Sequence, residues 1–161
     1  MSDKTWLQRA VDMFDNDRFK DGDLLSRDWI SHALDIPPIR SVQDAERIQW
    51  MTLARVEAFK EYLLVERKVA LRTARGQGYV VIPPSEQAEF AAREAMGLVQ
   101  KGLRKGTKIM ENTRLDALTD SQKRRHTDAE LRLSGLSQMM RRQRRDVFKL
   151  FRPQELEKDH A

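Results

Sequence analysis

The chain has 161 residues, enough for one or two small domains, and 40% of them are hydrophobic, which excludes wholesale disorder. It contains no cysteine, so disulfides, thiolate zinc sites and cysteine nucleophiles are excluded. It has no apolar run of eighteen residues and no signal-peptide pattern, and we therefore expect a soluble, cytoplasmic protein without a membrane partner.

The excess positive charge lies in the second half of the chain. Residues 1–84 carry 13 Lys and Arg against 13 Asp and Glu, whereas residues 85–161 carry 17 against 12. The stretch from Lys123 to Lys149 alone holds nine Lys and Arg against three Asp and Glu. Such an excess attracts nucleic acid or an acidic protein surface, although a solvated helix face has the same pattern. Six arginines of this stretch are candidate contacts to a polyanion: Arg124, Arg125, Arg141, Arg142, Arg144 and Arg145.

Two helices are predicted in the first 34 residues. Apolar residues at helical spacing indicate the first over residues 3–14, and the acidic stretch 15–23 is predicted to be a surface turn. Ser26 is the expected N-cap of a short helix over residues 27–34, which buries Trp29, Ile30 and Leu34. Two prolines at positions 37 and 38 then interrupt the chain.

A third helix is predicted from Ser41 or Asp44 to about residue 65. Its apolar residues recur at intervals of three and four, which predicts one buried stripe. The stripe consists of Leu53, Val56, Phe59 and Leu63.

The spacing of apolar residues changes from helical to alternating after residue 67, which predicts a β-hairpin. Residues 68–74 alternate between apolar and polar side chains, as a half-buried strand does. Gly76 and Gly78 allow a turn with positive φ, and residues 79–82 form the returning strand. Pro83 and Pro84 end it.

The remaining chain is predicted to be helical. Ser85 is the expected N-cap of a long helix that runs to about residue 113 and carries small residues along one side. Thr119 with Gln122 forms a capping box that opens the last helix. That helix has a heptad seam that predicts pairing with another helix, either in an antiparallel hairpin or in a dimerising arm. The seam consists of Ala129, Leu133, Leu136, Met140, Gln143, Val147 and Leu150. We expect a homodimer held through Leu133, Leu136, Met140, Val147 and Leu150.

These elements predict a mainly α fold with three parts: a winged helix-turn-helix over residues 1–84, a helical hairpin or coiled-coil arm over 85–152, and a charged tail over 153–161. Within residues 24–83, the segment "LLSRDWI" and the third helix are followed by a turn that contains Thr73, Arg75, Gly76, Gly78 and Tyr79. Together these parts resemble the winged-helix output domain of OmpR/PhoB-type response regulators. The five turn residues match the wing pattern of that family, while alanine replaces its usual valine at position 74.

The resemblance implies that the third helix enters the major groove of DNA and that the wing contacts the minor groove or phosphates. The implied contacts are Thr52, Arg55 and Lys60 on the helix and Arg72, Arg75 and Gln77 at the wing. Arginine can contact guanine with two hydrogen bonds, and the wing arginines would hold phosphates. The chain departs from the family because no receiver domain precedes residue 24 and because the helix carries Glu57, Glu61 and Glu66. The alternative is a tight hairpin turn without DNA contact.

Two functions remain open on this basis. The first is a DNA-binding regulator of transcription or replication, located at the nucleoid. The second is a phage or mobile-element interaction module, an inhibitor or adaptor, that binds an acidic protein surface. An enzyme is not expected, because no nucleophile, metal-ligand or phosphate-loop pattern occurs and His32, His126 and His160 are far apart in sequence. No cofactor or metal is expected.

Overall fold

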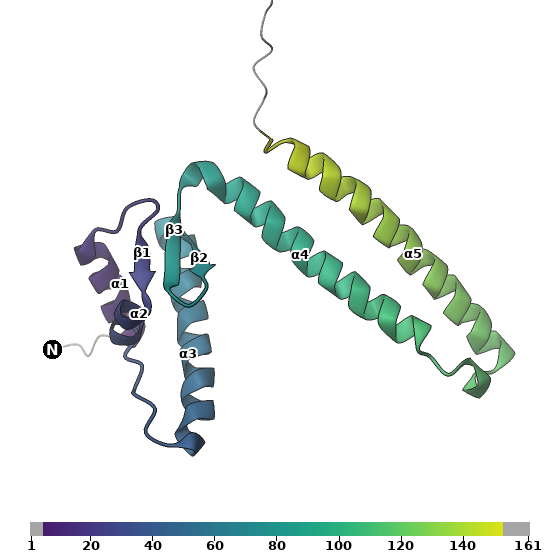
Figure 1. The fold of residues 1–161 in the computed structure, drawn as a ribbon, viewed down its shortest axis with the longest axis horizontal. Coiled ribbons are helices and arrows are strands. Elements are labelled where there is room, and N and C mark those ends of the chain that lie inside the picture. The colour runs from purple at the N-terminus through teal and green to yellow at the C-terminus, as the bar shows by residue number, and fades with distance from the viewer. Residues whose placement is uncertain (1–4, 153–161) are drawn as a thin grey trace, which may run out of the picture. The chain divides into compact units, whose positions relative to one another are not determined.

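The computed structural model describes residues 5–152 and is mainly helical, with one small antiparallel sheet (Figure 1). It divides into two compact units, Met1–Gln87 and Ala88–Ala161. The predicted tail over 153–161 and His160 lie outside the described residues. The elements follow one another in this order: α1 (Trp6–Asp17), β1 (Leu24–Ser26), α2 (Arg27–Ala33), α3 (Val42–Tyr62), a π-helical turn (Leu63–Arg67), β2 (Ala70–Ala74), β3 (Gly78–Ile82), α4 (Pro84–Glu111), a 3-10 turn (Leu115–Ala117) and α5 (Asp120–Lys149).

Hydroxyl side chains cap α2, α3 and α5 where the sequence predicts caps. The Ser26 hydroxyl accepts from the backbone N–H of Trp29 at 3.1 Å, and the Ser41 hydroxyl accepts from that of Asp44 at 3.1 Å. Thr119 forms the predicted capping box at the start of α5. The predicted cap Ser85 is wrong, because α4 begins before it, at Pro84. Proline suits the first turn of a helix because it lacks the N–H that this turn leaves unpaired.

The sheet has the order β1-β3-β2 and is antiparallel throughout. The predicted hairpin is present, with Ala74 opposite Gly78 and Leu71 opposite Val81. β1 was not predicted, because its three residues are a strand only through pairing with β3, more than fifty residues along the chain. The sheet therefore ties the start of α2 to the hairpin.

One apolar core holds the first unit together. Its fully buried members come from every helix and strand of this unit before α4. They are Ala10, Val11, Phe14, Leu25, Ile30, Ala33, Leu34, Val56, Phe59, Leu63, Leu71 and Val81. The predicted α3 stripe is correct at Val56, Phe59 and Leu63 but wrong at Leu53, which is 50% exposed. Ile48 is buried instead, because α3 turns this residue toward the inside of the unit.

An ion pair joins α1 to the π-helical turn. Arg67 donates to the Asp15 carboxylate at 2.8 Å, and this hydrogen bond raises the pKa of Arg67. The predicted turn over 15–23 begins inside α1, which ends at Asp17 because Arg18 is left-handed, with φ of 53°. The pair therefore fixes the last turn of α1.

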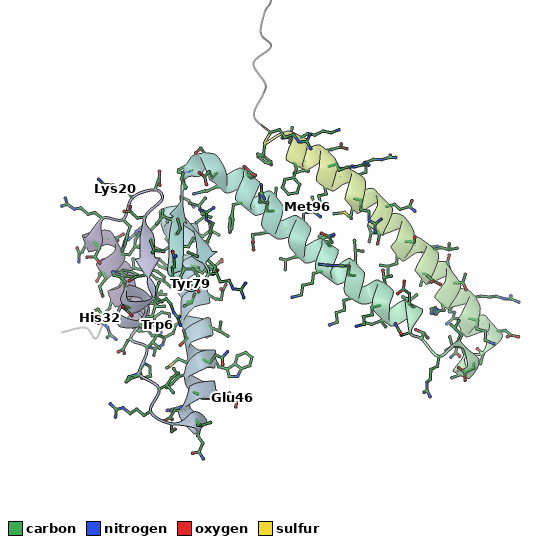
Figure 2. All side chains as sticks on the ribbon, in the orientation of Figure 1. Trp6, Lys20, His32, Glu46, Tyr79 and Met96 are labelled. Carbon is green, nitrogen blue, oxygen red and sulfur yellow. The ribbon has the colours of Figure 1, made fainter. Side chains whose placement is uncertain are left out.

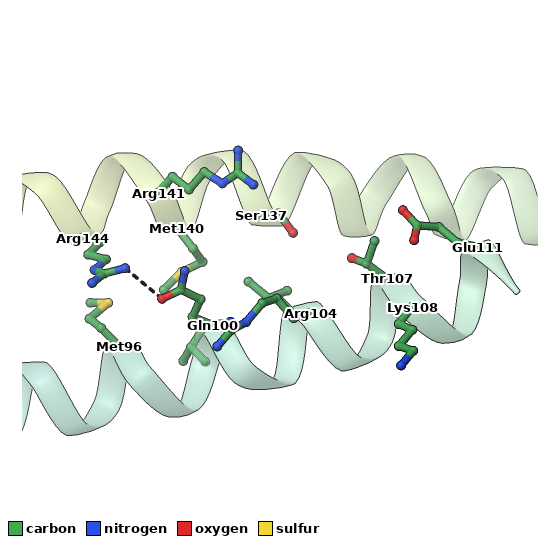
Figure 3. A pocket seen from close by; sticks show the side chains of 12 residues that line it. Met96, Gln100, Arg104, Thr107, Lys108, Glu111, Ser137, Met140, Arg141 and Arg144 are labelled. Atoms are coloured by element: carbon green, nitrogen blue, oxygen red, sulfur yellow. Dashed lines mark hydrogen bonds between the residues drawn. The ribbon is translucent and has the colours of Figure 1, made fainter.

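In the second unit, α4 and α5 run antiparallel beside each other (Figures 1 and 3). Arg144 donates to the Gln100 side chain at 2.8 Å, and Leu133 lies against Gly106, where an added Cβ atom would meet its Cδ2 at 3.3 Å. Of the predicted seam, Leu133, Met140 and Val147 are half-buried, whereas Ala129, Leu136, Gln143 and Leu150 are exposed. None of the described residues after Gln87 is fully buried. Among residues 5–152, no helix combines the length and the apolar character needed to cross a bilayer.

Candidate nucleic-acid interface

The β2–β3 hairpin presents two arginines and a glutamine to solvent at and beside its turn. Arg72 lies on β2, and Arg75 and Gln77 flank Gly76 in the turn; all three are exposed. The backbone N–H of Gln77 donates to the Ala74 carbonyl at 2.9 Å, and Gly76 has a φ of 78°, a conformation that favours glycine. Within residues 5–152, Arg72 and Arg75 take part in no ion pair. Their charges are therefore available to an anion.

A hollow of about 390 Å³ lies next to this turn, between α2, α3 and the hairpin. Arg27 and Ser31 line it from α2, Thr52 from α3 and Thr73 from β2. The Thr52 hydroxyl donates to the Ile48 carbonyl at 2.7 Å, which leaves its oxygen as an acceptor. The hollow thus joins the predicted helix contact Thr52 to the predicted wing.

Arg55 is bound within its own unit. Its Nη1 donates to the backbone carbonyls of Leu34 and Asp35 at 2.7 and 2.6 Å, and its guanidinium lies 5.2 Å from the centre of the Trp6 ring. These carbonyls end α2, where cations are favourable because the last carbonyls of a helix lack partners. The structure therefore places Arg55 as a clamp on the end of α2.

Lys60 is half-buried and is also paired. Its Nζ lies 3.1 Å from the Glu57 carboxylate and 5.9 Å from the centre of the Tyr79 ring. Figure 2 labels Tyr79 on β3, beside α3. Lys60 thus links α3 to the hairpin, and contact with a phosphate would require it to leave Glu57.

The outward face of α3 is acidic and apolar. Glu46, Trp50, Leu53, Glu57 and Glu61 recur at helical spacing on this face, and all five are exposed (Glu46 is labelled in Figure 2). Trp50 is 67% exposed. Sequence reasoning missed Trp50, and its position outside the buried stripe was the signal that could have found it. Carboxylates on this face repel phosphates, which disfavours deep entry of α3 into a DNA groove.

The arginines of α5 form two groups. Arg141, Arg142, Arg144 and Arg145 line a hollow of about 660 Å³ together with Phe148. Arg144 lies 5.9 Å from the centre of the Phe148 ring. The second group, Arg124 and Arg125, is exposed near the start of α5. Sixteen residues of helix separate Arg125 from Arg141, which corresponds to roughly 24 Å at the helical rise, so the structure does not bring the two groups together.

In the described part of the chain, Arg141, Arg142 and Arg145 have no carboxylate partner, unlike three other cations of α5. Lys123, Arg132 and Lys149 are each paired with an aspartate of the same helix. The unpaired arginines are therefore the stronger candidates for contact with an external anion.

Residues 5–152 contain no group of three His, Asp or Glu side chains that could hold a metal ion. No protein-family model, curated protein or solved structure matches the chain.

Proposed function

We propose that the protein is a DNA-binding regulator that contacts the phosphates of duplex DNA through the β2–β3 turn and the arginines of α5. The observation that carries the proposal is a group of five exposed arginines on the hairpin and on α5 that form no ion pair within residues 5–152: Arg72, Arg75, Arg141, Arg142 and Arg145. Lysine and arginine gain affinity for DNA by releasing the counterions that surround its phosphates. No catalytic group is needed for such a function.

The arrangement of the first unit supports this proposal. The order α1-β1-α2-α3-β2-β3 and the sheet order β1-β3-β2 are compatible with a winged helix-turn-helix, in which β2 and β3 form the wing. The hollow beside the turn is lined by donors from α2 and the hairpin. A protein of this kind would act in the cytoplasm, at the nucleoid.

The acidic outward face of α3 favours binding to phosphates over reading of base edges. Base readout in the major groove requires side chains that donate to or accept from the bases without repelling the backbone. Glu57 and Glu61 do not meet this requirement, and Arg55 is occupied at the end of α2. We therefore propose binding with weak sequence preference.

The proposal is tested by titrating a labelled random-sequence duplex and following fluorescence anisotropy at several salt concentrations. We expect the logarithm of the binding constant to fall linearly with the logarithm of the salt concentration, by about 0.9 for each phosphate contact. Replacing Arg141, Arg142 and Arg145 by glutamine should lower the slope by up to about 2.7. The same replacement at Lys123, Arg132 and Lys149 is the matched control, because these three cations of α5 are already paired. Absence of binding at low salt would refute the proposal.

A second candidate function is the binding of an acidic protein surface. It is favoured by the apolar side chains beside the α5 arginines, since protein interfaces bury an apolar centre and DNA phosphates do not require one. The affinity for an acidic protein surface falls less steeply with salt concentration than the affinity for DNA does. The salt titration therefore separates the two candidates.

A further inference from the structure

The tryptophan on the outward face of α3 has the character of a binding anchor. Trp50 is 67% exposed, and Leu53, one turn later, is 50% exposed. Glu46 and Glu57 lie on the same face, one turn before and two turns after the indole. Within residues 5–152, Glu46 takes part in no ion pair, whereas Glu57 is paired with Lys60 at 3.1 Å. Tryptophan is enriched among the residues that dominate protein interfaces, and an exposed indole gains free energy when it leaves water.

The second unit contains a groove of matching character between α4 and α5 (Figure 3). Its volume is about 260 Å³. The apolar lining consists of Met96, Val99, Leu103 and Met140. Methionine adapts its shape to an incoming side chain, because it is unbranched and its sulfur is polarizable. The groove is thus apolar and adaptable.

Cations surround this lining. Arg104, Lys108 and Arg141 lie at the groove, with Glu111 as the one carboxylate among its described lining residues. None of these three cations takes part in an ion pair within residues 5–152. Two such grooves would repel each other, so a groove-to-groove contact between copies is disfavoured.

Size and charge therefore match between the α3 face and the groove. A cavity of about 150 Å³ is large enough to bind benzene, so a groove of about 260 Å³ can take one indole ring. Glu46, the unpaired carboxylate beside Trp50, is opposite in sign to the cations that flank the groove. Complementary charges fix the register of an interface and exclude wrong partners.

We propose that Trp50 of one copy inserts into the α4–α5 groove of a second copy, with Glu46 facing Arg104 and Arg141. In a dimer with two-fold symmetry, this contact occurs twice, once in each direction. This contact differs from pairing through the predicted α5 seam.

The test is the mass of the chain in solution, measured by light scattering over a dilution series. We expect the wild type to be dimeric at micromolar concentration and Trp50→Ala to weaken the dimer at least about 30-fold, the loss expected for an interface hot spot. Leu131→Ala is the matched control, because it removes another exposed apolar side chain that does not line the groove. Far-UV circular dichroism and the melting temperature establish that each variant is folded.

A mixing experiment identifies the two surfaces. Trp50→Ala retains an intact groove, and the charge-reversed variant Arg104→Glu/Arg141→Glu retains Trp50, so each alone should be monomeric. Mixed together, they should form a heterodimer with one restored contact. A wild-type mass of one chain, a dimer unaffected by Trp50→Ala, or a mixture that stays monomeric would each overturn the proposal.

Discussion

The backbone carbonyl of Leu25 occupies the space that a Cβ atom on Gly78 would need. Gly78 is the first residue of β3, it pairs with Ser26 of β1, and its φ is 140°. β1 can therefore approach the hairpin this closely only because residue 78 has no side chain.

Replacing Gly78 by alanine should destabilise the first unit. The new methyl group meets backbone atoms, which cannot rotate away, and the positive φ is unfavourable for a residue with a side chain. We expect a loss of about 2–4 kcal/mol in the free energy of unfolding, and a larger loss for Gly78→Val. Urea unfolding followed by circular dichroism measures the loss of free energy in each variant. Gly76→Ala is the control, since Gly76 has open space around it and should lose only about 1–2 kcal/mol from its positive φ.

Arg55→Ala should lower stability by about 2–3 kcal/mol, because it removes two hydrogen bonds from a charged donor to the carbonyls that end α2. Arg55→Lys should recover only part of this loss, since an ammonium group lacks the planar fork of the guanidinium. Thermal unfolding checks the expected order of melting temperatures, with the wild type highest, Arg55→Lys next and Arg55→Ala lowest. DNA affinity that falls in Arg55→Ala at a temperature where the variant is fully folded would contradict a purely structural role.

Arg72→Ala/Arg75→Ala should weaken binding to duplex DNA without unfolding the protein. Both side chains are exposed and unpaired within residues 5–152, so their loss removes no contact of the fold. If each holds one phosphate, the salt slope should fall by about two units. Anisotropy titrations measure the slope. Lys20→Ala/Arg40→Ala removes the same charge from exposed loop positions; an equal effect of both pairs would remove the turn from the binding model.

Leu133→Asp should open the α4–α5 hairpin, whereas Leu136→Asp should not. Leu133 packs against Gly106, and placing a carboxylate there costs about 2 kcal/mol or more. Leu136 is exposed in the single chain. Loss of helical circular dichroism on mild heating checks the difference between the two variants.

The predicted homodimer through the α5 seam is tested separately. Leu136 and Leu150 are the exposed leucines of that seam, so Leu136→Asp/Leu150→Asp should dissociate a seam dimer. It should leave a dimer formed through Trp50 intact. Light scattering of Leu136→Asp/Leu150→Asp and of Trp50→Ala at micromolar concentration therefore distinguishes the two contacts.

Local signals predicted much of the fold. The caps at Ser26, Ser41 and Thr119 and the hairpin around Gly76 depend on residues that are close in sequence, and they are confirmed. β1 depends on a distant partner strand, so a three-residue segment carried too little pattern to predict it. Helical spacing placed Leu53 beside the true core residues but could not define the edge of the buried stripe.

The candidate site was less predictable. Residue type and the family pattern selected Arg55, and only the structure shows that the end of α2 binds it. The arginines of α5 were found from charge alone, because an exposed cation needs no partner in the fold. The groove between α4 and α5 could not be predicted, since it depends on which residues of two helices face each other.

None of residues 88–152 is fully buried, so we expect α4 and α5 to unfold locally more easily than the first unit does. Each segment of this helical pair is protected by few apolar contacts, so local openings there require little free energy. The first unit opens only when its core separates. Amide hydrogens of α5 should therefore exchange with deuterium long before those of Phe59 and Leu71, and a protease should cleave the helical pair first.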